Sequence, residues 1–294
     1  MEKLVISERD AKYLNLLKLD FRCHNESNLY LSPFNKDEII KCYYNTKKPG
    51  TREARLKTIE NYLEFINNED IPELLKPSKY FYVGKNFRGL VLPRIYGKNA
   101  SFYLENENVP LNIKIEILKQ IGNILQIIKN APSKYGAAFA DVHNDNFMVT
   151  GLDLEKNNLD FKTIGIDAES MKVLDNPGQS NVYLITNSKL DLPKYEHSSL
   201  IMMKPSSETD IYCFAMMILE LISSNNCIFS ISLQDYFWYL DYLDKLGMDA
   251  KLLESLRSVC EDKDSINPLP HLDNIKEIPK EANYKIYRSK NGSY

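Results

Sequence analysis

One segment of the chain is apolar on nearly every side of a helix, and it limits the folds that the chain can adopt. Residues 207–223 read "SETDIYCFAMMILELIS". A helix with this pattern belongs in a protein interior, because none of its faces is suited to water. Its apolar run is too short to span a bilayer, and it contains Glu220. The segment is therefore expected to be a buried helix of a globular protein.

The rest of the chain divides into a strand-rich first part and a helical second part. An apolar period of 3.6 residues predicts helices that include Leu56 and Leu111. Clusters of β-branched and aromatic residues predict strands over residues 13–21, 28–34, 39–44, 80–84 and 88–95, and a later hairpin formed by 147–151 and 161–167. With 294 residues, the chain is expected to form an α+β fold, in which a small β-rich lobe with one main helix precedes a larger helical lobe.

Charge and cysteine usage exclude several classes of protein. The net charge is −3, so nothing points to a nucleic acid or an anionic membrane surface as partner. The first residues, "MEKLVISERDAKYL", lack the long apolar run and the small-residue cleavage site of a signal peptide. The five cysteines are scattered without metal-ligand spacing, which is typical of free thiols. A cytoplasmic protein is expected.

The polar string "FADVHNDNFMV", residues 139–149, lies between segments that are suited to burial. Taken alone it could be a solvated turn, because Asp and Asn favour turns. The predicted hairpin, however, would bring Asp141 and Asn146 at its base close to Asp167 at its far end. Carboxylate and amide oxygens are suitable ligands for Mg²⁺, which takes its other ligands from phosphate and water. One aspartate would remain to orient a hydroxyl nucleophile.

Two charged residues stand among apolar neighbours in the first part of the chain. Lys41 lies in the middle of the strand predicted over 39–44, and Glu60 lies within the apolar stripe of the first helix. A buried lone charge is unfavourable, so each would need a partner, and the two are natural partners for each other. The alternatives are an edge-strand lysine that reaches to solvent and a glutamate at the border of the stripe.

Five motifs, in the same order, resemble those of the protein-kinase-like superfamily over roughly residues 12–275. "ADVHNDNFMV" is similar to the catalytic-loop pattern HRDxxxxN, with Asp141 and Asn146 at its aspartate and asparagine. "IGIDAES" is similar to the DFG segment, with Asp167 as its aspartate. "EIIKCYY" is similar to the VAIK strand with Lys41, and Glu60 takes the place of the helix glutamate that pairs with that lysine. "SETDIYCFAMMILELI" resembles the buried "SDxYSFGxxLxEL" helix of protein kinases.

The resemblance implies a two-lobed fold and a role for each residue. Asp141 would orient the attacking hydroxyl and accept its proton. Asn146 and Asp167 would hold Mg²⁺ or Mn²⁺ on the phosphates of ATP, and Lys41, fixed by Glu60, would contact the α- and β-phosphates. These roles would explain why the loop that carries Asp141 is polar while both of its flanks are apolar.

The resemblance also implies a hinge that binds adenine and a boundary between the lobes. "GLVLPRI" resembles the hinge, with Leu92 at the gatekeeper place. Pro93 would offer its C=O and Ile95 its N–H to adenine. Proline is compatible with a position that only accepts a hydrogen bond. The expected lobes are residues 1–95, which bind the nucleotide, and 96–294, which carry the catalytic loop and the metal ligands.

The sequence departs from the family pattern at the phosphate loop and around the catalytic aspartate. No glycine precedes Gly50, so the expected glycine-rich turn reads "RCHNES", residues 22–27. Ala140 stands where regulated kinases carry the arginine that pairs with a phosphorylated activation loop. His143, and Glu169 in "IDAES", look more like the corresponding positions of aminoglycoside and choline kinases.

These features leave three main functions open, beside the transfer of another moiety, such as AMP, from the same nucleotide site. The first is a protein kinase that transfers the γ-phosphoryl group of ATP to Ser or Thr hydroxyls, favoured by the buried helix and by the long segment between Asp167 and Asp210. The second is a small-molecule kinase, favoured by "DVH" and "IDAE". The third is a nucleotide-binding pseudokinase, favoured by the missing glycine loop. ATP and Mg²⁺ are the expected ligands in the first two, with a protein as the preferred acceptor and a small molecule as the alternative.

Overall fold

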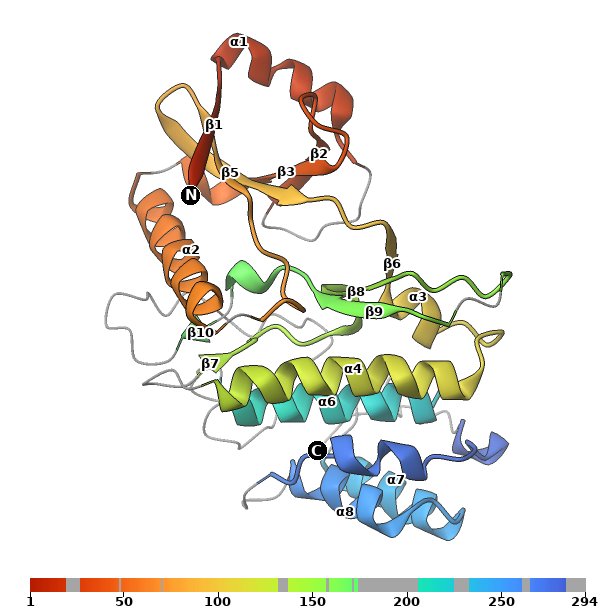
Figure 1. Ribbon diagram of the computed structural model, residues 1–294. Coiled ribbons are helices and arrows are strands. Elements are labelled where there is room, and N and C mark those ends of the chain that lie inside the picture. The colour runs from red at the N-terminus through yellow and green to blue at the C-terminus, as the bar shows by residue number, and fades with distance from the viewer. Residues whose placement is uncertain are drawn as a thin grey trace, which may run out of the picture.

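The chain has an α+β architecture with a five-stranded mixed sheet at one end and helices at the other (Figure 1). The computed structural model describes residues 1–19, 27–47, 49–69, 71–131, 137–156, 159–170, 172–173, 206–224, 233–260 and 265–283. The expected turn at 22–27, apart from Ser27, and most of the segment between Asp167 and Asp210 lie outside these ranges.

The five-stranded sheet has the order β1-β4-β5-β3-β2, in which β1 is parallel to β4 and the other pairs are antiparallel. Its strands are β1 (Glu2–Ile6), β2 (Ser27–Leu31), β3 (Glu38–Tyr43), β4 (Lys79–Val83) and β5 (Asn86–Pro93). Short helical segments accompany it: α1 (Glu8–Ala11), η1 (Tyr13–Leu17) and η2 (Tyr44–Lys47).

The alternation of side chains along β3 decides where Lys41 points. Ile40 and Cys42 face a small core on the outer side of the sheet, whereas Ile39 and Tyr43 face the main core of the molecule. Because side chains alternate along a strand with a period of two, Lys41 lies on the same face as Ile39 and Tyr43. That face looks toward α2 (Pro49–Glu69) and the segments that follow β9.

Two long helices form the base on which the central loops lie (Figure 1). The expected helix around Leu111 is confirmed as α4 (Leu111–Asn130), and the segment that is apolar on nearly every side is confirmed as a buried helix, α6 (Ser207–Ile222). They pack closely at Gly122, where a Cβ atom would lie 2.8 Å from the Phe214 ring. The expected helix around Leu56 is confirmed as α2.

The remaining elements surround this base. Between the sheet and the long helices lie β6 (Gly97–Asn99), α3 (Ala100–Leu104), β7 (Ala137–Ala138), η3 (Asn144–Asn146), β8 (Phe147–Thr150), β9 (Lys162–Gly165), η4 (Ala168–Ser170) and β10 (Lys172–Val173). Below them lie α7 (Leu233–Lys245), α8 (Ala250–Ser258), η6 (Leu269–Asn274) and η7 (Lys280–Ala282). The predicted hairpin is confirmed as the antiparallel pair β8 and β9.

The strand expected over residues 13–21 is wrong over its first part, where the structure has the 3-10 helix η1 (Tyr13–Leu17). Lys18 forms an isolated bridge to Tyr30 on β2, and residues 20 and 21 lie outside the described ranges. Leucine favours helix more than the β-branched residues do, and this segment contains none of the latter. The first strand of the sheet is instead β1, which the sequence patterns did not indicate.

Among the described residues, no helix combines the length and the apolar character needed to cross a membrane. Cys42, Cys213 and Cys260 are free thiols, as their spacing predicted, and the other two cysteines lie outside the described ranges.

Candidate active site

The loop that carries Asp141 is held by the buried helix α6. Asp210, in the first turn of α6, accepts hydrogen bonds from the backbone N–H groups of Phe139 (2.7 Å) and Ala140 (3.0 Å). Ala140 has a positive φ of 73°, which is unfavourable for a residue with a Cβ atom. The two bonds therefore stabilise a strained loop next to Asp141.

Burial also changes the acidity of this anchor. It raises the pKa of Asp210 to about 7, although the two backbone N–H groups act in the opposite direction. A carboxyl group with so little contact with water serves the architecture of the loop rather than its chemistry.

Asp141 and Asn146 form a direct pair within the loop. The Asn146 side-chain amide donates to the Asp141 backbone carbonyl at 2.8 Å and to its carboxylate Oδ2 at 3.0 Å. The Nε2 atom of His143 lies 3.7 Å from the same Oδ2 atom. Burial raises the pKa of Asp141, but His143 and Asn146 outweigh burial and keep this pKa below its usual value. The ionised form can accept a proton.

The other carboxylate oxygen of Asp141 is an unused acceptor. Oδ1 is buried and has no hydrogen-bond partner in the part of the chain that the structure describes. A buried unpartnered oxygen is unfavourable by about 1–3 kcal/mol, so the site favours a ligand that donates a hydrogen bond there.

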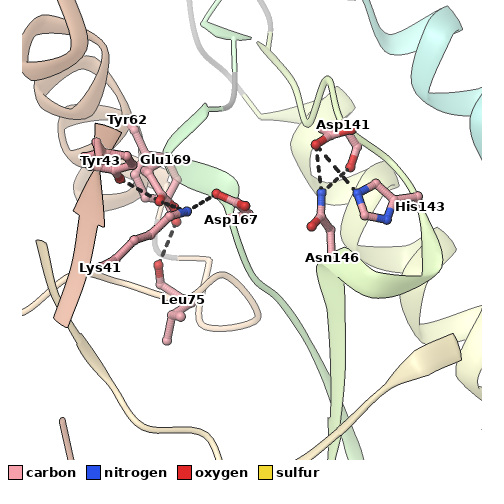
Figure 2. Close-up of polar contacts among 9 residues, drawn as sticks. All are labelled: Lys41, Tyr43, Tyr62, Leu75, Asp141, His143, Asn146, Asp167 and Glu169. Carbon is pink, nitrogen blue, oxygen red and sulfur yellow. Dashed lines mark hydrogen bonds and ion pairs between the residues drawn. The ribbon is translucent and has the colours of Figure 1, made fainter. Parts of the chain in front are cut away.

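The β8–β9 hairpin brings Asp167 close to this loop. The Ile166 N–H donates to the Asn146 carbonyl at 2.8 Å, next to the paired residues Phe147 and Gly165. Asp167 follows with a φ of 61°, a conformation that aspartate tolerates better than most residues. Asn146 and Asp167 thus lie in neighbouring backbone segments, as the sequence predicted, whereas the Asp167 carboxylate is directed toward Lys41 (Figure 2).

Lys41 reaches from β3 to two carboxylates on the segment after β9. Its ammonium group forms ion pairs with Asp167 and with Glu169, and the Tyr43 hydroxyl donates to Glu169 at 2.7 Å (Figure 2). Burial alone would lower the pKa of Lys41, but the two carboxylates outweigh burial and raise it. Lys41 is therefore a buried, fully charged cation.

The expected partner of Lys41, Glu60, is wrong. Glu60 is exposed on α2, so it is not available to a lysine whose side chain is buried. The buried hydrophobic residues of α2 that face the core are Ile59, Tyr62, Leu63, Phe65 and Ile66. Glu60 belongs to the solvent-facing border of the apolar stripe, and Glu169 takes the place that was assigned to it.

The expected hinge lies at the end of β5. Leu92 is buried, Pro93 is exposed and Ile95 is half-buried. The Arg94 N–H donates to the Asp37 carbonyl at 2.8 Å. Because neighbouring residues of a strand direct their backbone groups to opposite sides, the Pro93 carbonyl points away from β3. A role of Pro93 and Ile95 in adenine binding stays a prediction.

The oxygen atoms of the site fit a hard divalent cation. Asn146 uses its amide N–H₂ on Asp141, which leaves its carbonyl oxygen available, and the Asp167 side chain is 44% exposed. Within the described ranges, no group of three His, Cys, Asp or Glu side chains is arranged to hold a metal. A Mg²⁺ ion that takes one amide and one carboxylate oxygen from protein, and the rest from phosphate and water, does not need such a group.

Sequence reasoning missed the roles of Glu169 and Tyr43. A signal for Tyr43 was present, because residues two apart on a strand share a face and Tyr43 follows Lys41 at this spacing. For Glu169 the signal was its proximity to Asp167 in "IGIDAES". Its partner Lys41 lies 128 residues away, a separation that no local pattern covers.

Comparison with protein-family models finds no match for the chain, and comparison with curated proteins finds none either.

Proposed function

We propose that the chain is an ATP- and Mg²⁺-dependent phosphotransferase with a two-lobed, protein-kinase-like arrangement, in which residues 1–95 and 96–294 form the lobes. One observation carries the proposal. A buried lysine on β3 forms an ion pair with Asp167 after β9, next to the bonded pair Asp141 and Asn146. These residues come from three distant segments and supply a cation, two oxygen ligands and a base.

The chemistry follows from the position of each group. Lys41 contacts the α- and β-phosphate oxygens of ATP, and Asp141 accepts a hydrogen bond from the acceptor hydroxyl. That oxygen forms a bond to the γ-phosphorus while the bond from this phosphorus to the β–γ bridging oxygen breaks, so ADP leaves and the hydroxyl proton passes to Asp141. Asn146 and Asp167 would hold Mg²⁺, which would supply charge neutralisation for the transferred phosphoryl group.

The preferred acceptor is a Ser or Thr hydroxyl of a protein. The support is the buried helix α6, whose Asp210 anchors the catalytic loop and which small-molecule kinases usually lack. A small alcohol is the second candidate, because His143 lies beside Asp141 in the D-x-H arrangement that resembles aminoglycoside and choline kinases.

The test is incubation of the purified protein with γ-labelled ATP and Mg²⁺. Asp141→Asn removes the base with little change of shape, and Asp145→Asn, an exposed aspartate in the same loop, is the matched control. We expect label transfer by the wild type and by Asp145→Asn, and none with Asp141→Asn or with a chelator. Label on protein supports the first candidate, whereas turnover only with small alcohols supports the second. Transfer that survives in Asp141→Asn contradicts the proposal.

A further inference from the structure

The two carboxylates that pair with Lys41 differ in their surroundings. The Glu169 side chain is 3% exposed and the Lys41 side chain 7%, whereas that of Asp167 is 44% exposed. An exposed carboxylate can rotate toward a ligand and exchange its partner for water. A carboxylate as deeply buried as Glu169 must keep its partner, because an unpaired charge in that place is strongly unfavourable.

Glu169 is also held by a second bond. The Tyr43 hydroxyl donates to the same Oε1 atom that pairs with Lys41, and the Tyr43 ring lies on the same face of β3 as Lys41. Arg55 of α2 stacks over this ring, with its guanidinium carbon 4.7 Å from the ring centroid. Two residues of β3 thus hold Glu169, and Arg55 of α2 packs against one of them, Tyr43.

The helix α2 offers no carboxylate that could replace that of Glu169. Acidic residues of α2 are absent from its core-facing side: Glu53, Glu60 and Glu64 are exposed and Glu69 is half-buried. Ile59 and Tyr62 instead occupy the buried face that packs near η4.

We infer that Glu169 is the permanent positioning residue of Lys41, supported by Tyr43, and that Asp167 is the exchangeable partner that turns to the metal when nucleotide binds. The inference rests on the proposed function. In this arrangement the position of Lys41 is set by the turn η4, which begins directly after Asp167, and not by a glutamate of a helix. The same few residues of this turn then position both Lys41 and the metal ligand Asp167.

The division of roles is tested by the affinity for a fluorescent ATP analogue, measured with Mg²⁺ and with a chelator. Glu169→Gln should lower the affinity about tenfold or more under both conditions, because Lys41 loses a charged partner. The ratio of the affinity with Mg²⁺ to the affinity with the chelator should stay as in the wild type. Asp167→Asn should bring this ratio close to one. Tyr43→Phe should resemble Glu169→Gln with a smaller loss, and Glu64→Gln, an exposed glutamate of α2, is the matched control and should change nothing.

Tyr43→Phe keeps the test decisive if Glu169→Gln does not fold, since it removes only a hydroxyl group. Wild-type affinity in Glu169→Gln, or in Tyr43→Phe where the former does not fold, overturns the inference while the proposed function stands. An affinity ratio close to one in Glu169→Gln also overturns the inference, because Glu169 would then be a metal ligand. A wild type that binds the analogue under neither condition overturns the proposed function, and the inference with it.

Discussion

The carboxylate of Asp210 accepts the backbone N–H of Ala140 at 3.0 Å, across 70 residues of sequence. This contact joins the buried helix α6 to the residue before the proposed catalytic base. It explains why the loop keeps a conformation that an alanine does not adopt by itself.

Asp210 should make stability depend on pH. Its pKa is raised from 3.8 to about 7 by burial, so folding favours the neutral carboxyl group. The resulting stabilisation is complete below about pH 3.8 and is lost as the pH rises through about 7. Relative to Asp210→Asn, the wild type should therefore lose stability between pH 4 and 7, as measured by urea unfolding at several pH values. Parallel profiles for the two proteins would contradict this assignment.

Ala140→Gly should stabilise the protein. A left-handed conformation is unfavourable by about 1–2 kcal/mol for a residue with a Cβ atom, and the greater freedom of glycine in the unfolded chain offsets about 0.5–1 kcal/mol of the gain. A net increase of about 0.5–1 kcal/mol in the free energy of unfolding is expected. Ala138→Gly, at a buried strand position without positive φ, is the control and should destabilise. A loss of stability in Ala140→Gly would show that the methyl group packs favourably there.

The parts of the fold that the sequence predicted are those that depend on local pattern. α6 was recognisable because its apolar residues cover nearly every face, and α2 and α4 because an apolar residue recurs every three or four positions. The strand prediction failed at residues 13–17 because the neighbouring leucines form no clear period, so their preference for helix decided the local structure.

The sequence named Lys41, Asp141, Asn146 and Asp167, which the structure places in the candidate site, but it did not predict all of their pairings. A lysine in the middle of an apolar strand correctly indicated a buried charge that needs a partner. The partner was wrong because Glu60 lies at the border of a helical stripe, and the rotation of α2 against the sheet decides which side of that border faces solvent. Packing between elements sets this rotation, and a sequence window does not contain it.

The stability of the protein should reveal which glutamate pairs with Lys41. Lys41→Met and Glu169→Gln each leave a buried charge with fewer partners, so the double variant should be less destabilised than the sum of the single ones. A coupling of about 0.5–3 kcal/mol is expected. The same cycle with Glu60→Gln should be additive, because Glu60 is exposed. Thermal or urea unfolding measures both cycles without any nucleotide. Coupling to Glu60 in place of Glu169 would restore the pairing that the sequence suggested.

His143 and Asp141 should stabilise each other within a limited pH range. Burial lowers the pKa of His143, but the Asp141 carboxylate outweighs it and raises the pKa above 6.5. The contribution of His143 is thus complete below pH 6.5 and is lost as the pH rises through its folded value. The pKa of Asp141 is lowered from 3.8, so its contribution is present above 3.8 and is lost in stronger acid. His143→Gln should therefore reduce the free energy of unfolding more at pH 5.5 than at pH 8.5. The difference should be about 1 kcal/mol or less, since both side chains are partly exposed. Equal losses at the two pH values would mean that His143 acts through packing alone, and that Asp141 keeps its low pKa through Asn146.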